Sequence, residues 1–446
     1  MRDPRAVRKG EHVMSTMMGN LRRVILAGLA AGAVLTFGLV NDARADVASD
    51  QPGAILIWPK IVVDTEGFFG DPQIDTEIQV TNTSNAVIAA RCWIVNATSH
   101  CSNDPEQACL ESVECAPGGL CIPQWSDIDF RMTLTKRQPV TWNASQGLPS
   151  FPCSGVTGDN CPFGQSNRGS DGSPSSVPPV QEDPFFGEMK CVQVDPNTFQ
   201  PSRGFDPANN FGGDLKGEAT IIRLEERDNS NDTDLVDARK YNAIGLQATG
   251  RAGQVLPCPD PTVPPELCLQ IGGPNAQYNG CPNVLIMNHF FDDAFVETHA
   301  RRIDAPVVSH LTVIPCGEDF RLQENNLGGA VMQFLVYNEF EQRFSTSTRF
   351  DCWREVQLSD IDTRPGPFGN PQSIFNVGVQ GTLTGQSRIR PVAGPVFGNT
   401  ILGVLEEFWE CDGSRHPDGI CTTASNLHFT GTREQGDLLI ISPELP

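Results

Sequence analysis

The sequence lacks the short motifs that mark the common catalytic sites. It contains no G-x-S-x-G, no H-E-x-x-H and no Gly-rich phosphate loop, which are typical of serine hydrolases, zinc proteases and nucleotide-binding proteins. No C-x-x-C occurs among its fifteen cysteines. That absence excludes the c-type haem signature, the thioredoxin-like redox motif and the usual zinc ribbon. We therefore expect a protein that is not an enzyme.

Basic residues are also scarce, with 32 Lys and Arg against 54 Asp and Glu, a net charge of −22. The first 45 residues hold seven of the basic and three of the acidic side chains, which leaves 25 against 51, or −26, for residues 46–446. A surface of that sign repels phosphate backbones and anionic lipids. Nucleic acid is therefore a poor partner. With only three Tyr, the chain also offers few aromatic platforms for sugars.

The N-terminal residues have the pattern of an export signal. Leu21-Arg22-Arg23 is positive, Val24–Val40 is apolar, and Ala43-Arg44-Ala45 fits a signal-peptidase site. We predict a signal peptide over residues 1–45, cleaved near Ala45 to leave Asp46 first, in a bacterium. The mature chain should then be secreted, periplasmic or at the cell surface, with no insertion into the membrane.

Cysteine is abundant, and an exported chain meets an oxidising compartment where disulfides persist. An odd count of fifteen predicts seven bridges and one unpaired thiol. Spacing cannot fix the connectivity. The candidate partners are Cys92 with Cys191, Cys153 with Cys161, Cys316 with Cys352, Cys411 with Cys421, and two local bridges among Cys101, Cys109, Cys115 and Cys121; two of Cys258, Cys268 and Cys281 would form the seventh.

Hydrophobic periodicity predicts an all-β fold. Phe130–Leu134 and Phe375–Val379 alternate apolar and polar residues, as half-buried strands do. Ala54–Val63, Val87–Val95 and Val331–Tyr337 are continuously apolar, which fits strands covered on both faces. No amphipathic helix of three turns is found. The 42 Gly and 35 Pro fit many short strands joined by tight turns.

Five short matches recur in the same order in the two halves of the chain. They suggest two related β-sandwich domains, immunoglobulin-like or jelly-roll-like, at residues 50–254 and 283–446. The Pro-rich stretch 255–282 would link them, residues 101–121 would form a Cys-rich insertion, and residues 164–183 a mobile loop. The matches pair Gln79–Asn82 with Gln333–Asn338, Cys92-Trp93 with Cys352-Trp353, Ser126–Asp129 with Ser359–Asp362, Thr133–Thr135 with Thr382–Thr384, and Thr220–Glu226 with Thr400–Glu407.

Two groups of residues are candidate metal ligands. Asp228, Asp232, Asp234 and Asp237 offer alternating oxygens of the kind that Ca²⁺ prefers, although the stretch fails the EF-hand pattern and a polar turn explains it as well. The second group is His289, Asp292, Asp293, Glu297 and His299, whose spacing does not fit one helix face. No other cofactor is indicated.

These observations favour an exported structural, adhesive or binding protein of unknown ligand. One alternative is a secreted hydrolase with a site between the two domains. Another is a polymerising surface subunit that donates Ala54–Val63 to a neighbouring copy as a strand.

Overall fold

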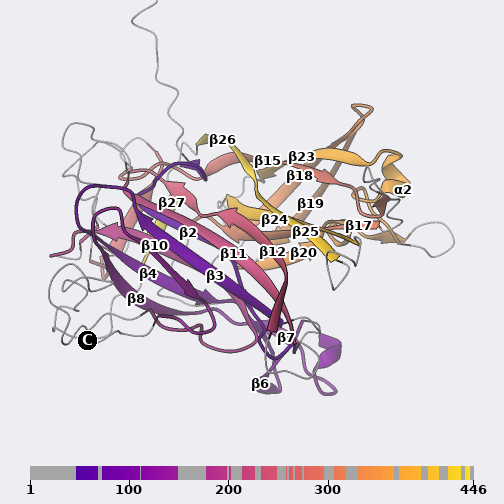
Figure 1. The fold of residues 1–446 in the computed structure, drawn as a ribbon. Helices are drawn as coiled ribbons and strands as arrows, with labels where there is room; N and C mark the ends of the chain where they lie inside the picture. Colours follow the sequence, from indigo (N-terminus) through magenta and orange to yellow (C-terminus); the bar gives the residue numbers. More distant parts are fainter. Residues whose placement is uncertain are drawn as a thin grey trace, which may run out of the picture. The chain divides into compact units, whose positions relative to one another are not determined.

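The structure is a computed structural model of the chain (Figure 1). It describes residues 47–68, 73–110, 112–148, 177–197, 200–201, 213–226, 233–248, 258, 261–264, 267–273, 276–295, 306–317, 330–350, 352–365, 371–392, 400–410, 420–432 and 437–441. The predicted signal peptide and the loop 164–183, except for residues 177–183, lie outside these residues.

The fold is all-β, as the periodicity predicts. The helical elements with described bounds are α2 (Val377–Gln380) and two 3₁₀ turns, η1 (Ser112–Glu114) and η3 (Leu358–Asp360). The prediction of a strand at Phe375–Val379 was wrong, because these residues form a turn and the start of α2. Every pair of neighbouring strands in the described sheets is antiparallel.

The first half of the chain supplies two sheets. The larger has the order β1-β13-β2-β10-β4-β8 and the smaller the order β12-β11-β3-β9. One hydrophobic cluster takes residues from both, including Trp58, Ile78 and Trp142, so the two sheets pack against each other. The strands are β1 (Val47–Ala48), β2 (Ile55–Val63), β3 (Gln73–Asn82), β4 (Ile88–Asn96), β8 (Ser126–Leu134), β9 (Pro139–Asn143), β10 (Phe185–Val194), β11 (Leu215–Glu226), β12 (Thr233–Asn242) and β13 (Ile244–Leu246).

The second half supplies two more sheets, with the orders β19-β18-β23-β15-β26 and β16-β17-β24-β25, and β20 pairs with β17. Their common cluster includes Leu311, Phe334 and Phe375. Whether either pair of sheets follows an immunoglobulin or jelly-roll plan stays a prediction. The strands are β15 (Pro282–Phe290), β16 (Ala294–Phe295), β17 (Pro306–Pro315), β18 (Ala330–Asn338), β19 (Arg343–Phe350), β20 (Arg354–Gln357), β23 (Thr384–Pro391), β24 (Ile401–Glu410), β25 (Ile420–Asn426) and β26 (His428–Thr432).

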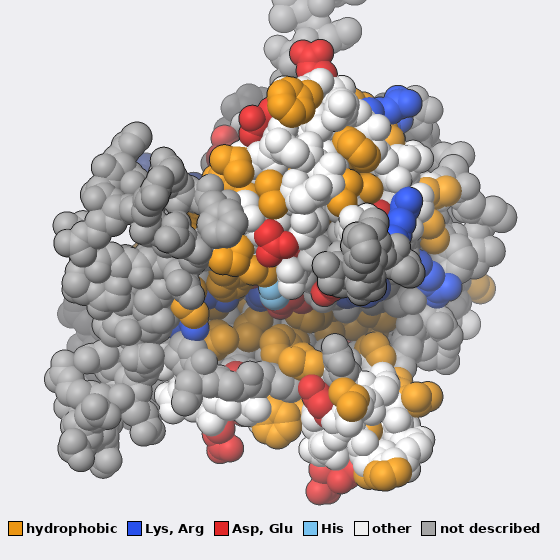
Figure 2. All heavy atoms as spheres, turned by 90° about the vertical axis from the view of Figure 1, so that its right-hand side faces the viewer, with side chains coloured by type: hydrophobic (Ala, Val, Ile, Leu, Met, Phe, Trp, Pro, Cys, Tyr) orange, Lys and Arg blue, Asp and Glu red, His pale blue; other side chains and the backbone are white. Residues whose placement is uncertain are grey.

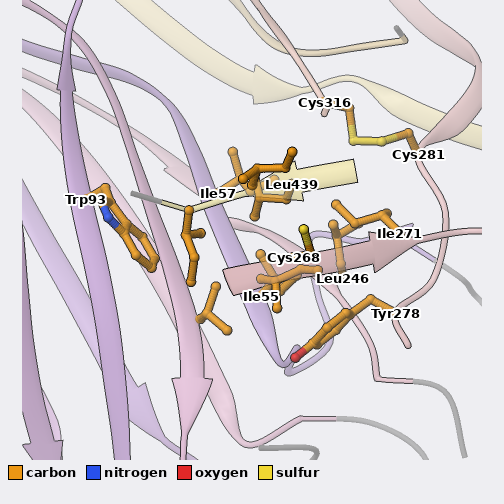
Figure 3. Packing of buried hydrophobic residues seen from close by; sticks show 14 of the residues in the cluster. Ile55, Ile57, Trp93, Leu246, Cys268, Ile271, Tyr278, Cys281, Cys316 and Leu439 are labelled. Atoms are coloured by element: carbon orange, nitrogen blue, oxygen red, sulfur yellow. A yellow bond between two sulfur atoms is a disulfide. The ribbon is translucent and has the colours of Figure 1, made fainter. Parts of the chain in front are cut away.

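A third cluster joins the two halves (Figure 3). Ile55 and Trp93 from the first half, Tyr278 from the predicted linker, and Leu439 near the C-terminus all belong to it. Within the linker, β14 (Cys268–Ile271) pairs with β27 (Asp437–Ile440). Much of the described part of residues 255–282 is therefore packed into a core, while the division into two domains stays a prediction.

Strand β2 shows why a continuously apolar run is needed here. Ile55 and Ile57 belong to the cluster that joins the halves, whereas Leu56 and Trp58 belong to the core of the first half. Alternate side chains of a strand point to opposite faces, so both faces are covered. Since β2 also pairs with β13 and β10 on its two edges, Ala54–Val63 is not free for donation to another copy.

The structure corrects the proposed internal repeat. Gln79–Asn82 and Thr220–Glu226 lie on β3 and β11, which are paired in one sheet, but their counterparts lie on β18 and β24, in different sheets. Ser126–Asp129 begins strand β8, whereas Ser359–Asp362 lies in and after η3. What Asn82 and Asn338 share is local: each side-chain oxygen accepts a backbone N–H two residues on, a turn that Asn favours.

Five disulfides join described cysteines, and they agree only partly with the expected partners. Cys92–Cys191 links β4 to β10, neighbouring strands in which the two residues lie opposite each other. Cys316 is bonded to Cys281 instead of Cys352, because the end of β17 lies beside the start of β15. Cys352 adopts a φ of 55° in the turn before β20 and is not a strand residue. The other bridges are Cys101–Cys115, Cys109–Cys121 and Cys258–Cys268; Cys421 is also disulfide-bonded, and Cys153, Cys161 and Cys411 lie outside the described residues.

Candidate functional site

A pocket of about 710 Å³ lies over one end of the strands β15, β23 and β18. The register places Asn288 of β15 and Tyr337 of β18 on either side of Gln386 of β23. These three side chains therefore form one row across the sheet. We call this cavity the polar pocket; its lining residues are Asn288, His289, Phe290, Tyr337, Asn338, Glu339, Glu341, Thr384, Gly385, Gln386, Arg388 and Glu407.

The rim of the polar pocket is shaped by a tight turn after β18. The side-chain oxygen of the buried Asn338 accepts the backbone N–H groups of Phe340 and Gln342, both at 3.0 Å. Glu341 has a φ of 61°, in the left-handed region that few side chains adopt. Asn338 thus fixes the turn that carries Glu339 and Glu341 to the mouth of the pocket.

Carboxylates outnumber cations in this lining. Glu339 accepts hydrogen bonds from the backbone and hydroxyl of Thr384, and these hold the pKa of Glu339 below its usual value. Burial raises the pKa of Glu407, which accepts the Phe290 N–H at 2.8 Å. Arg388 is the single cation of the lining, and its guanidinium lies 5.8 Å from the ring centre of Tyr337.

Beneath the pocket lies a hydrogen-bonded His–Ser pair. His289 Nδ1 lies 3.0 Å from the Phe290 carbonyl oxygen, which can only accept, so Nε2 accepts from the Ser387 hydroxyl at 2.9 Å. Burial lowers the pKa of His289 to about 4, so the ring is neutral near pH 7. The neighbouring Gly385 is required sterically, because a Cβ there would come within 2.4 Å of the Phe291 ring.

The His–Ser pair lacks an exposed nucleophile. Ser387 has 0% of its surface exposed and His289 only 3%. A nucleophilic hydroxyl must contact the substrate carbonyl, and this hydroxyl points into the protein core. The pair therefore anchors β15 to β23 at the floor of the pocket.

A second group of charges lies between the two halves of the chain. Lys60 of β2 forms ion pairs with Glu406 of β24 and, at 2.7 Å, with Glu355 of β20. Arg239 of β12 binds the other oxygen of Glu406. We call Lys60, Arg239, Glu355 and Glu406 the ionic cluster. It contains two cations and two anions, so its charge is balanced.

The ionic cluster has few contacts with water. Burial alone would raise the pKa of Glu406, but the charges of Lys60 and Arg239 hold it below its usual value. The same competition lowers the pKa of Glu355, with Lys60 and His310 as the opposing charges. The hydroxyl of Tyr241 donates to the Lys60 carbonyl and accepts the Lys60 N–H. The cluster therefore ties β2 and β12 to β20 and β24.

Other bonds across the same boundary are neutral. The Trp353 indole N–H donates to the Pro59 carbonyl at 2.8 Å. Asn426 Nδ2 donates to the Asn242 carbonyl at 2.8 Å and its Oδ1 accepts the Asn242 N–H at 3.0 Å. The Asn426 side chain thus bonds the backbone of Asn242 as a neighbouring strand would, and it joins β25 to β12.

The predicted calcium ligands lie in a strand where they are described. β12 begins at Thr233, so Asp234 and Asp237 are strand residues and not loop residues. Asp237 accepts a hydrogen bond from Thr422 and lies 4.0 Å from the Arg239 guanidinium. Asp228 and Asp232 lie outside the described residues. Calcium binding here stays a prediction.

The predicted carboxylate–imidazole group is divided among separate hydrogen bonds. Asp292 is buried and accepts the backbone N–H groups of Ser309 and Ser359, and burial raises its pKa. Asp293 accepts from the Asn376 side chain instead. His289 bonds Ser387, as above, while Glu297 and His299 lie outside the described residues. In the part of the chain that the structure describes, the one group with metal-ligand spacing is Cys101, Cys109 and Cys115, whose sulfurs are in disulfides.

Sequence reasoning missed both the polar pocket and the ionic cluster. One signal was available for the cluster: Lys60 is a lone charge in the apolar run Ala54–Val63. A charge within a doubly covered strand needs a buried partner. The pocket has no such signal, since Asn288, Tyr337 and Gln386 are far apart in the sequence.

No family model matches the chain, and no curated protein shows significant similarity to it. Among the described residues there is no helix of the length and hydrophobicity needed to cross a membrane.

Proposed function

We propose that the chain is an exported, non-catalytic binding protein and that the polar pocket is its ligand site. The observation that carries the proposal is the convergence of polar side chains from three strands on one open cavity of about 710 Å³. Ligand pockets combine such a concave shape with a few well-placed polar groups. The pocket lining offers no exposed serine or cysteine nucleophile.

Export is supported by the disulfides. Five bridges join described cysteines, and disulfides persist mainly in oxidising compartments. The apolar run Val24–Val40 followed by Ala43-Arg44-Ala45 is consistent with a cleaved signal. The proposed location is therefore the periplasm, the cell surface or the medium.

The chemistry of the lining favours a ligand that donates hydrogen bonds and carries no negative charge. Glu339, Glu341 and Glu407 are acceptors when ionised, and Asn288 and Gln386 each add a carbonyl oxygen. Hydroxyls of a saccharide and protonated amines both supply such donors. An anionic ligand would be repelled by three carboxylates and attracted by one guanidinium.

The test is calorimetric titration of the mature chain with three probes: cellotetraose as a neutral saccharide, spermidine as an amine, and gluconate as an anion. We expect cellotetraose or spermidine to bind and gluconate not to bind. The double variant Gln386→Ala with Glu339→Gln should reduce that binding at least about tenfold, the loss of about 1.4 kcal/mol.

The matched control is Glu77→Gln on β3, an exposed carboxylate on another sheet. It should leave ligand binding unchanged and show that the loss of one negative charge elsewhere on the surface does not weaken binding. Preferential binding of gluconate, or equal loss in the control, would refute the proposed site. Heat from cellotetraose turnover that continues after saturation would instead support the hydrolase alternative for this class of substrate.

A further inference from the structure

The second candidate surface is the Cys-rich insertion, which we call the knob (residues 99–123). It contains the small sheet β6-β5-β7, made of β5 (Ser99–Cys101), β6 (Asp104–Ala108) and β7 (Cys121–Pro123), together with η1. Cys101, Cys109 and Cys115 are buried and form its interior. Two disulfides thus replace a hydrophobic core in a segment too short to build one.

The knob leaves its large apolar side chains in solvent. Leu110 is 58% exposed, Val113 82%, Leu120 60% and Ile122 40%. These are half of the eight large hydrophobic side chains that are exposed in the described residues, although the knob is a small part of them. Single exposed apolar residues need no explanation, but a group of them marks an interaction surface.

The covalent structure of the knob gathers these four residues. Cys109, next to Leu110, is bonded to Cys121, which lies between Leu120 and Ile122. The Ser112 hydroxyl accepts the Cys121 N–H at 3.0 Å, which holds η1, the 3₁₀ turn that contains Val113, beside Cys121. The chain segments that carry the four apolar side chains are therefore held together by one disulfide and this hydrogen bond.

The backbone under this surface is held in place before any partner arrives. The Glu114 carboxylate accepts the Leu110 N–H at 2.7 Å. Leu120 donates to the Ser102 hydroxyl at 2.9 Å, and its carbonyl accepts the Ser102 N–H at 2.8 Å. A surface that is already ordered loses little conformational entropy on binding, which favours affinity.

The charge around the apolar residues has one sign. Asp104, Glu106 and Glu114 are exposed, and there is no Lys or Arg between Ser99 and Phe130 in the sequence. In the lower part of Figure 2, where β6 and β7 lie in Figure 1, orange side chains are interspersed with red ones and no blue is visible. A complementary partner must therefore be basic as well as apolar.

From this combination we infer that the knob is a docking surface for a basic, amphipathic polypeptide segment of another protein. A second copy of this chain does not fit, because its own surface is acidic and would be repelled. Anionic lipid is disfavoured for the same reason. The groove beside the knob, about 380 Å³ and lined by Pro105, Ile122 and Trp125 among others, adjoins the apolar group through Ile122. It would receive one apolar side chain of the segment.

The experiment uses the mature chain and three synthetic 14-residue peptides, one of Leu and Lys, one with Glu in place of Lys, and one with Ser in place of Leu. Fluorescence anisotropy should show binding of the Leu/Lys peptide alone, weakened as salt rises. The variant Leu110→Ser with Val113→Ser should weaken it at least about tenfold. Because both side chains are exposed, the variant should keep its disulfides, which intact mass under non-reducing conditions checks.

The control variant is Phe340→Ser with Leu383→Ser, which removes two exposed apolar side chains elsewhere (69% and 45% exposed). It should bind the Leu/Lys peptide as the wild type does. The inference is overturned if both variants lose affinity equally, or if the Lys/Ser peptide binds as well as the Leu/Lys peptide. Either result would mean attraction to the acidic surface as a whole. Absence of binding by any peptide would also overturn it.

Discussion

The ionic cluster and the polar pocket contain the same types of charged side chain, but in different surroundings. In both, an Arg lies against an aromatic ring: Arg239 is 5.1 Å from the centre of Phe408, and Arg388 is 5.8 Å from that of Tyr337. In the cluster the two cations meet two carboxylates and little water. In the pocket one cation stands among three carboxylates, of which Glu339 and Glu341 are exposed and Glu407 is half-buried.

This difference separates charges that hold the fold together from charges available to a ligand. Buried charges must be neutralised by one another, since desolvation is costly. Exposed charges cost little to leave unpaired. The surplus of carboxylates in the pocket is therefore permitted by solvent, and it is the property that a cationic or donor-rich ligand would use.

The largest expected effect comes from removing the shared cation of the cluster. Lys60→Met keeps the length of the side chain but leaves Glu355 with His310 as its remaining partner and Glu406 with Arg239 as its remaining cation. Breaking a buried ion pair in this way costs about 3–5 kcal/mol of unfolding free energy. Urea denaturation at pH 7 measures this cost.

The matched control is Lys240→Met, because Lys240 pairs with Glu218 while its own side chain is 52% exposed. That pair should contribute less than about 1 kcal/mol. If the two variants are equally stable, the cluster does not hold the two halves of the chain together, and the comparison with the pocket fails.

The second prediction concerns the loss of stability in acid, which should occur over a different pH range in each of the two regions. The pKa of His289 is lowered to about 4 by burial, whereas in the unfolded chain it is about 6.5. Between these values the unfolded state binds the extra proton, so stability is lost as pH falls from about 7 to about 4. The loss is about 3 kcal/mol.

His289→Gln removes this titration while keeping an amide that can bond Ser387. Its free energy of unfolding should therefore change less between pH 7 and pH 4 than that of the wild type. The carboxylates of the ionic cluster act in a lower window, because their lowered pKa values cost stability only below the usual carboxyl pKa. Parallel pH curves for the two proteins would contradict a buried, neutral His289.

The sequence predicted where strands lie better than it predicted which strands pair with each other. Ala54–Val63 and Val87–Val95 became doubly covered strands because burial along a strand is a local property that a window of residues records. Val331–Tyr337 also became a strand, but one of its faces is only half-buried. The order of strands is not local, so the matched segments on β18 and β24 fell into different sheets. Cys352 illustrates the same limit: it matched the strand residue Cys92 in the proposed repeat, but a positive φ places it in a turn.

The candidate site was beyond sequence reasoning for a related reason. The row of Asn288, Gln386 and Tyr337 exists only through the register of three strands. Polar residues on the open face of an antiparallel strand have the same pattern whether or not they line a pocket.

The smallest expected effect separates the two arginines. Arg388→Ala removes an exposed guanidinium whose contacts are the Tyr337 ring and, at 3.4 Å, the Gln386 oxygen. An exposed cation–π contact contributes about 0.5–1 kcal/mol, so the unfolding free energy should fall by no more than that. Arg239→Ala, in contrast, should cost several times as much, because it leaves the fully buried Glu406 with Lys60 as its remaining cation. Urea denaturation of the two variants side by side tests the distinction directly. Both variants lose the same type of side chain and the same kind of ring contact. A large loss of unfolding free energy in Arg388→Ala would mean that the charges of the pocket stabilise the fold. A small loss in Arg239→Ala would mean that the ionic cluster does not.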